Sequence, residues 1–396
     1  MIRNTGILTG ASFVSMFFLG VGTAIIGAAS GNIGLSPFQT GLLISMQNAG
    51  FILAVLVAGS LADTRDKARL LGFGSLVLAV SFFLFYLWPP YSLNLAIMFF
   101  IGVGIGTYEG VADAMLFGIY KERQGFFISV NHFFVTLGCL AITLYLVFLR
   151  LADWRRSLVQ SAAVVILLAV LFLLSRTPAG GREAAKLQER LAFLRTQSIL
   201  GIFLVAAVFG IGMELGLLGL LTSFLMELRG YDQVSSKLGL ILFFSGIAAG
   251  RVLLGLISRR RRLLTLIIAL FAAAAVLSAI LFLFALPAVL NSILLFFLGL
   301  TVSSLLPLLI TLTGFLYKDM SGTALGIVKL GIPVGGILIP FVLSLVSRYF
   351  SFKISLLVFP LIALVSGIML AATRKIIDAR VELVTAGVVE GAGETS

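Results

Sequence analysis

Twelve long apolar runs constrain the fold of this chain more than any other feature of its sequence. Each is about 20 residues long or longer, and a helix of that length crosses the roughly 30 Å of hydrocarbon in a bilayer. Because lipid offers the backbone no hydrogen-bond partner, runs of this length favour helices. The sequence therefore predicts an all-α membrane protein with twelve transmembrane helices. The runs cover residues 6–30, 38–61, 70–89, 93–119, 125–149, 155–175, 198–226, 235–257, 263–285, 290–316, 323–347 and 353–373.

Composition excludes several other classes of protein. Only 11% of the residues are charged and 60% are hydrophobic, so the chain cannot cover the surface of a water-soluble domain of this size. The net charge of +12 comes from basic residues in short loops between apolar runs, a pattern typical of membrane topology and not of a nucleic-acid interface. Cys139 is the only cysteine, which excludes a disulfide within one chain. The sequence has no phosphate-binding loop, metal-ligand cluster or catalytic triad, so we expect neither an enzyme nor a bound cofactor.

The distribution of Lys and Arg predicts the orientation of the helices. If the N-terminus lies inside, the inner loops and termini hold 19 of these residues and the outer loops hold 7. Basic residues accumulate on the cytoplasmic side of membrane proteins. We therefore expect both termini to be cytoplasmic, in a multi-pass protein of the cell (inner or plasma) membrane.

The two halves of the chain repeat each other at an offset of 197 residues. Phe99–Gly102 recurs as Phe296–Gly299, and Tyr120–Glu122 recurs as Tyr317–Asp319. A duplication of this kind predicts two pseudo-symmetric six-helix bundles joined by a polar linker. We also expect a cytoplasmic tail that lacks stable structure. The predicted parts are an N-terminal bundle at 1–175, a linker at 176–197, a C-terminal bundle at 198–375 and a tail at 376–396.

Six ionisable residues lie inside the apolar runs, where each charge costs roughly 2.5–3.5 kcal/mol near the bilayer centre. Glu109 and Asp113 are four residues apart, so they share one face of the fourth helix. Two carboxylates this close in a low dielectric cannot both ionise cheaply, so one can bind a proton near neutral pH. His132 lies at a similar depth on the fifth helix and is expected to contact Asp113. We predict that these three residues couple transport to protons; a purely structural ion pair is the alternative. The six residues are Glu109, Asp113, His132, Glu214, Arg251 and Lys329.

Three further polar residues are candidates for binding a solute. Glu214 lies in the middle of its run, and no donor near it in the sequence could pair with it. Asn131 offers a donor and an acceptor, which suits a polar solute or an interhelical bond. Lys329 matches His132 at the repeat offset and could bind an anionic group or pair with Asp113.

The loop after the second run carries a recognisable motif. Residues 59–69 read Gly-Ser-Leu-Ala-Asp-Thr-Arg-Asp-Lys-Ala-Arg, which resembles the major facilitator loop motif G-x-L-a-D-r-x-G-r-k, with Asp66 where that family has glycine. The resemblance implies that Asp63, Arg65 and Lys67 belong to an inner gate. Arg251 is expected to serve there too, or to be structural, because its long side chain can reach towards the inner surface.

A narrower resemblance points to the fucose/proton symporter-like branch of the major facilitator family. That branch has a membrane carboxylate on its fourth helix, which Glu109 matches by context, and the family fold leaves helices 3, 6, 9 and 12 at the periphery. All six ionisable residues then fall on the eight helices that surround the central cavity. The resemblance is carried by Gly102, Gly104, Tyr108, Glu109, Tyr120–Arg123, Asn131–Phe134, Gly138, Gly212, Glu214, Gly250 and Arg251.

These observations predict a secondary transporter that works by alternating access between its two halves. The favoured function is proton-coupled symport of a small polar solute, sugar or sugar-like, by a monomer in the lipid bilayer. A proton-driven exporter of drugs or amphipathic compounds is one alternative, and a lipid flippase or a transport-inactive sensor is another. Sodium could replace the proton as the coupling ion.

Overall fold

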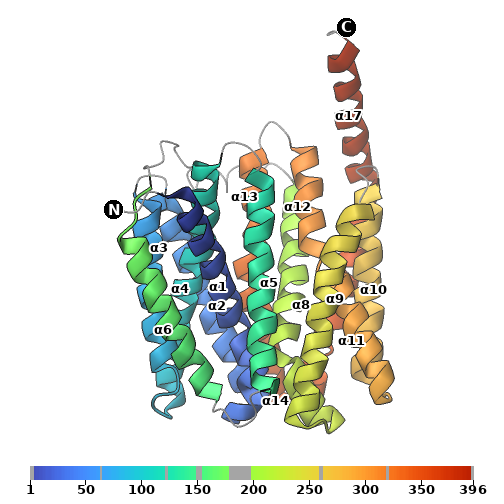
Figure 1. Ribbon diagram of the computed structural model, residues 1–396. Coiled ribbons are helices and arrows are strands. Elements are labelled where there is room, and N and C mark those ends of the chain that lie inside the picture. Colours follow the sequence, from blue (N-terminus) through green and yellow to red (C-terminus); the bar gives the residue numbers. More distant parts are fainter. Residues whose placement is uncertain are drawn as a thin grey trace. The chain divides into compact units, whose positions relative to one another are not determined.

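The computed structural model describes residues 4–62, 65–120, 124–148, 154–177, 198–257, 262–317 and 321–393 (Figure 1). Within these ranges, twelve helical spans are long and apolar enough to cross a membrane, which confirms the predicted number. The first nine of these spans are single helices. They are α1 (Thr5–Ile33), α2 (Pro37–Ala62), α3 (Lys67–Leu84), α4 (Tyr91–Ile119), α5 (Gln124–Phe148), α6 (Trp154–Leu173), α8 (Ser198–Arg229), α9 (Gln233–Ile257) and α10 (Leu263–Leu283).

The last three spans are each divided into two helices. Every division lies three or four residues before a proline, which has no N–H to donate to the carbonyl four residues earlier. Pro307 follows the break at Ser303, Pro333 follows the break at Leu330, and Pro360 follows the break at Leu356. The divided spans are α11 (Ala288–Val302) with α12 (Leu305–Leu316), α13 (Ser321–Lys329) with α14 (Gly331–Tyr349), and α15 (Phe352–Ser355) with α16 (Val358–Ala372).

The chain forms two compact units. The first contains Met1–Ala184 with Leu218–Phe244, and the second contains Ala185–Leu217 with Ser245–Ser396. In the first unit α2 packs on α4, α1 packs on α5, and α3 packs on α6 (Figure 1). In the second unit α10 packs on α16 and α11. The division at residues 175 and 198 follows the sequence repeat and stays a prediction, and residues 178–197 of the expected linker lie outside the described ranges.

The sequence repeat is visible in matching side-chain geometry. Asn94 near the start of α4 donates its amide to the carbonyls of Trp88 and Pro90, and Asn291 near the start of α11 donates to that of Leu286. Both asparagines are buried. The pair Phe99 and Phe100 on α4 meets edge to face at 5.6 Å, and Phe296 and Phe297 on α11 do so at 5.5 Å. Two halves with the same local structure support the predicted pseudo-symmetry.

Equivalent glycines also bring the helices into contact in both units. A Cβ at Gly50 on α2 would lie 2.0 Å from the carbonyl oxygen of Phe99, and a Cβ at Gly246 on α9 would lie 2.0 Å from that of Phe296. Neither distance is possible for a real side chain. The small residue is therefore what allows α2 to approach α4, and α9 to approach α11, in the way that membrane helices commonly pack.

The tail is helical, which corrects the expectation that it lacks stable structure. Helix α17 (Arg374–Gly393) follows α16 directly, and its Ile377 is fully buried. The Arg380 guanidinium lies 4.3 Å from the ring centroid of Tyr317 at the end of α12. Arg374 donates to the hydroxyl of Thr265 on α10. These contacts attach the first turns of α17 to the second unit. The prediction from the sequence rested only on the low hydrophobicity of this segment.

Candidate functional site

The predicted contact between Asp113 and His132 is present. Oδ2 of Asp113 on α4 lies 2.9 Å from Nε2 of His132 on α5. The two side chains are 25% and 41% exposed. The other carboxylate oxygen, Oδ1, accepts a 2.8 Å hydrogen bond from Nδ2 of Asn131. Both oxygens of Asp113 therefore meet nitrogen atoms of consecutive residues on α5.

The network extends to the first helix through a residue that the sequence did not single out. Ser12 on α1 donates from Oγ to Oδ1 of Asn131 at 3.1 Å. Both Ser12 and Asn131 are fully buried. The Asn131 amide thus lies between two protein partners, so the structure shows the interhelical bond that the sequence left open beside solute binding. In the sequence, a single serine on an apolar helix does not indicate a contact with another helix.

Glu109 lies one turn before Asp113 on the uninterrupted helix α4, so the two carboxylates share a face as predicted. Its side chain is half-buried. Glu109 therefore lies about one helical turn along α4 from Asp113. Its role in proton coupling stays a prediction.

Glu214 has a donor partner, which corrects the expectation from its sequence neighbourhood. Nη2 of Arg251 on α9 lies 3.0 Å from Oε1 of Glu214 on α8. Glu214 is buried, whereas 41% of the Arg251 side chain is exposed. The partner was missed because it belongs to the next helix, 37 residues away. A buried carboxylate that is matched by a guanidinium avoids most of the penalty of an unpaired charge.

The position of Arg251 is fixed by the residue before it. The carbonyl of Gly250 accepts a 3.1 Å hydrogen bond from Ser304 Oγ, at the break between α11 and α12. This bond ties α9 to the broken tenth span beside the ion pair. The Glu214–Arg251 pair is therefore held by three helical spans of the second unit.

Lys329 is not part of that ion pair. It is the last residue of α13, and its exposed side chain forms no hydrogen bond or ion pair with any residue that the structure describes. Its carbonyl cannot receive the usual helical bond, because Pro333 has no N–H. Solute binding by Lys329 stays a prediction.

The motif of the predicted inner gate is only partly described. Asp63 lies outside the described residues, Arg65 is exposed, and Lys67 begins α3. Asp66, which replaces the family's glycine, caps α3 by accepting from the N–H of Ala68. The same Asp66 oxygen also accepts from both the N–H and the hydroxyl of Thr177, just after α6. The departure from the motif thus has a local structural purpose.

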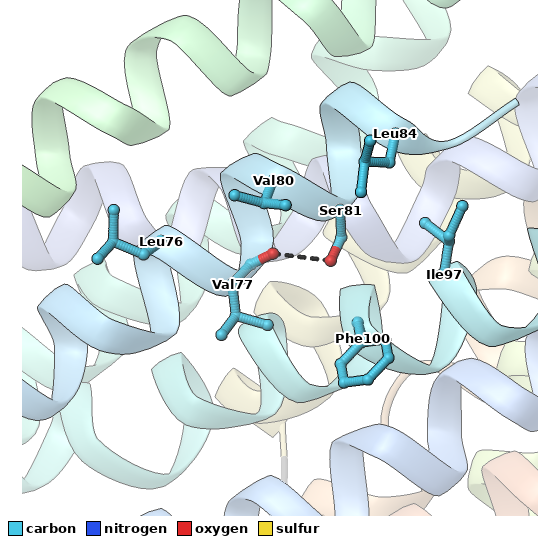
Figure 2. Close-up of a pocket in the computed structure, with 7 residues that line it drawn as sticks. All are labelled: Leu76, Val77, Val80, Ser81, Leu84, Ile97 and Phe100. Atoms are coloured by element: carbon cyan, nitrogen blue, oxygen red, sulfur yellow. Dashed lines mark hydrogen bonds between the residues drawn. The ribbon is translucent and has the colours of Figure 1, made fainter. Parts of the chain in front are cut away.

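An apolar groove lies between α3 and α4 on the first unit (Figure 2). Its polar side chain, Ser81, donates to the carbonyl of Val77 in its own helix at 2.7 Å, as Figure 2 shows. None of the candidate residues lines the groove, and its chemistry suits a hydrocarbon chain rather than a polar solute. The lining residues are Leu76, Val77, Val80, Ser81, Leu84, Ile97 and Phe100.

Comparison with known proteins gives one family and several similar folds. The sequence profile described as "Major Facilitator Superfamily" matches residues 8–317. The glucose/mannose transporter of Bacillus subtilis (strain 168) is 22% identical over 378 residues, covering 87% of this chain and 88% of the relative. A D-xylose–proton symporter structure aligns with a TM-score of 0.72 and 13% identity, over 92% of this chain and 96% of that one. A nucleoside transporter structure aligns with a TM-score of 0.74 and 12% identity, over 92% and 98%. At such identities the structures show a common fold.

Proposed function

This chain belongs to the Major Facilitator Superfamily, a family of transporters and not of enzymes, and we propose that it is a proton-coupled symporter of a small polar solute of the sugar class. The sugar class is supported by the relative named as a glucose/mannose transporter and by the D-xylose–proton symporter that shares the fold. In this proposal the monomer spans the plasma membrane with both termini in the cytoplasm, and its halves alternate access to a central solute.

The observation that carries the proposal is the contact between Asp113 and His132. With a neutral imidazole and an ionised carboxylate, the pair carries a net charge of −1. When the pair binds one proton, its net charge becomes zero. In a medium of low dielectric that change is a large electrostatic difference. A conformational step that moves the pair away from water is therefore favoured only in the protonated form, which links the step to a proton.

The same geometry favours a proton over sodium as the coupling ion. Sodium, like other hard cations, prefers a shell of oxygen ligands. Both oxygens of Asp113 already lie within 2.9 Å of nitrogen atoms, from Asn131 and His132. A metal ion at this carboxylate would have to displace both contacts, whereas a proton needs to displace neither.

The second unit supplies polar groups that suit the hydroxyls of a sugar. Glu214 offers acceptor oxygens, and Arg251 offers several N–H donors on a side chain that is 41% exposed. Because the carboxylate is already paired with a cation, a neutral solute can bind there without leaving a charge unmatched. We propose this pair as the solute-binding group of the second unit.

Uptake into proteoliposomes tests the proposal. With glucose or mannose as the probe and an imposed pH gradient, acidic outside, wild-type protein should accumulate the sugar. Asp113→Asn should lose accumulation at least about tenfold, a loss of about 1.4 kcal/mol of coupling, yet retain exchange of labelled for unlabelled sugar. Asp378→Asn in α17 is the matched control and should behave as wild type. Full accumulation by Asp113→Asn would overturn the role of Asp113. Sugar accumulation driven by a sodium gradient without a pH gradient would overturn the choice of the proton as coupling ion.

A further inference from the structure

We infer that Asn131 and Ser12 are positioning residues that hold the Asp113 carboxylate in one orientation, so that proton exchange takes place at its contact with His132. This inference rests on the proposed proton coupling. To that proposal it adds a chain of three hydrogen-bonded contacts, which runs from α1 to α5, from α5 to α4, and from α4 back to α5. Ser12 Oγ, the Asn131 amide, the Asp113 carboxylate and the His132 imidazole follow one another at 3.1, 2.8 and 2.9 Å.

The first step concerns the two oxygens of Asp113. A carboxylate has two equivalent oxygens and can bind a proton at either one. Asn131 donates to Oδ1, so one lone pair of that oxygen meets a hydrogen that is not transferred, because an amide N–H is not acidic at physiological pH. Oδ2 faces a group that gains and loses a proton, the ring nitrogen of His132.

The second step concerns the orientation of Asn131. The oxygen and nitrogen of its amide could exchange places by rotation of the side chain. In the exchanged orientation an amide oxygen would face Oδ1 of Asp113, and two acceptors would repel each other. Ser12 adds a donor on the far side, where only the amide oxygen can accept. The Asp113 carboxylate, which can only accept, thus favours the orientation in which Asn131 donates to it, and Ser12 adds a hydrogen bond to the amide oxygen in that same orientation.

Burial makes this selection effective. Ser12 and Asn131 are both fully buried, so water cannot replace a lost partner at either site. Among the residues that the structure describes, α2 brings no ionisable side chain to α4, and α3 has Lys67 and Arg69 in its first turn. His132 faces Asp113 from α5, Glu109 lies one turn earlier on α4, and Tyr120 near the end of α4 bonds to Thr9 of α1. Helix α1 itself has no ionisable side chain, so it reaches the pair through neutral hydroxyls.

The consequence is a specific shift in the pH dependence of transport. Removing the Asn131 donor takes away a hydrogen bond that favours the ionised carboxylate, so Asp113 retains its proton to higher pH. We expect Asn131→Leu to move the pH profile of sugar uptake to higher pH by about one unit. Ser12→Ala should move it in the same direction by a smaller amount. A merely structural role would lower the amount of active protein without moving the profile.

A matched serine gives the control. Ser15 is also on α1 and fully buried, and its hydroxyl donates only to the Ser12 carbonyl within the same helix, at 2.7 Å. Ser15→Ala should leave the profile at the wild-type pH, whereas an equal shift for Ser15→Ala and Ser12→Ala would overturn the inference. The double variant Ser12→Ala/Asn131→Leu should shift no further than Asn131→Leu, because Ser12 acts through Asn131.

A second measurement separates this inference from the proposed function. His132 is the only histidine in the chain, so the ¹⁵N signals of labelled histidine report it alone. In purified protein, Asn131→Leu and Ser12→Ala should both change the pH midpoint of the His132 signal, and Ser15→Ala should not. Loss of pH-driven uptake in the wild type would refute the proposed function, while the His132 midpoint would still test the positioning role. Unchanged midpoints and unchanged profiles in both variants would overturn the positioning role alone.

Discussion

The Asp113 carboxylate and the His132 imidazole meet at 2.9 Å between α4 and α5, although 19 residues separate them in the chain. Each belongs to a long and predominantly apolar span, and both side chains are partly exposed. A carboxylate and an imidazole at this distance share a titration, since the charge of one changes the affinity of the other for a proton. In the function proposed above, this pair exchanges the proton during transport.

The titration of His132 can be observed directly. Because the chain has no other histidine, ¹⁵N labelling gives an unambiguous signal in nanodiscs. Asp113→Asn removes the negative charge next to the ring, so the imidazolium loses its counter-ion and should give up its proton at lower pH than in the wild type, by about one pH unit or more. Asp378→Asn should leave the midpoint in place. Identical midpoints for Asp113→Asn and wild type would contradict a functional pairing.

The Glu214–Arg251 ion pair should respond asymmetrically to the loss of either partner. Arg251→Met removes the guanidinium that pairs with the buried Glu214 carboxylate, and should lower the free energy of unfolding by about 3–5 kcal/mol. Glu214→Gln should lower it by less, because the Arg251 side chain is 41% exposed. The measurement is thermal unfolding in detergent.

The double variant completes the comparison. Glu214→Gln/Arg251→Met removes both charges, so it should be more stable than Arg251→Met alone. Equal and additive losses in the two single variants would show that the side chains do not interact in the folded protein.

The contact at Gly50 gives a prediction about helix packing. In Gly50→Ala the new methyl group would lie 2.0 Å from the Phe99 carbonyl oxygen, so α2 and α4 must move apart. We expect a loss of stability of about 1–3 kcal/mol, as for other overpacked sites. Gly118→Ala on α4 is the control, because its new methyl group would have no atom of another part of the chain within 4 Å. That variant should be neutral or slightly stabilised, since alanine favours helix over glycine. Similar melting temperatures for both variants would disprove the close approach of α2 and α4.

A cation–π contact contributes to the docking of the tail helix. Arg380→Gln removes the cation over the Tyr317 ring and should weaken docking by about 0.5–2 kcal/mol. Hydrogen exchange of residues 374–393 should then accelerate. Lys375→Gln changes an exposed basic residue of the same helix and should have no effect. Faster exchange in both variants would indicate a general effect of charge.

Tail docking should also be insensitive to pH in the physiological range. Burial raises the pKa of Tyr317 above its ordinary value, and the nearby Arg380 lowers it by less. The ring therefore stays neutral below its ordinary pKa, and its contact with the cation is kept as the pH rises from about 6 to 8. A marked change in tail exchange over this interval would assign the docking to other groups.

The helices and their repeat could be predicted because apolar length and local motifs depend only on neighbouring residues. The Asp113–His132 contact could also be predicted, because the depth of each residue follows from counting along its own helix. The Glu214–Arg251 pair could not be found by a search for a donor near Glu214 in the sequence. Finding the pair requires knowing which faces α8 and α9 turn towards each other. The sequences of two apolar helices do not show this.

The same limit applies to Ser12. Helix α1 is apolar on all sides, so its sequence does not show which face meets α5, and the bond to Asn131 appears only in three dimensions. The broken spans follow a local rule, because each break comes shortly before Pro307, Pro333 or Pro360.

Proton movement that accompanies the sugar is the most direct test of proton coupling by the Asp113–His132 pair. Glucose or mannose is added to weakly buffered proteoliposomes without any imposed gradient, and the external pH is recorded. The external medium should become more alkaline as wild-type protein carries sugar and protons inward together, and Asp113→Asn should give no pH change while still exchanging labelled sugar. Sugar uptake by the wild type at constant external pH, or an unchanged proton signal in Asp113→Asn, would contradict the account.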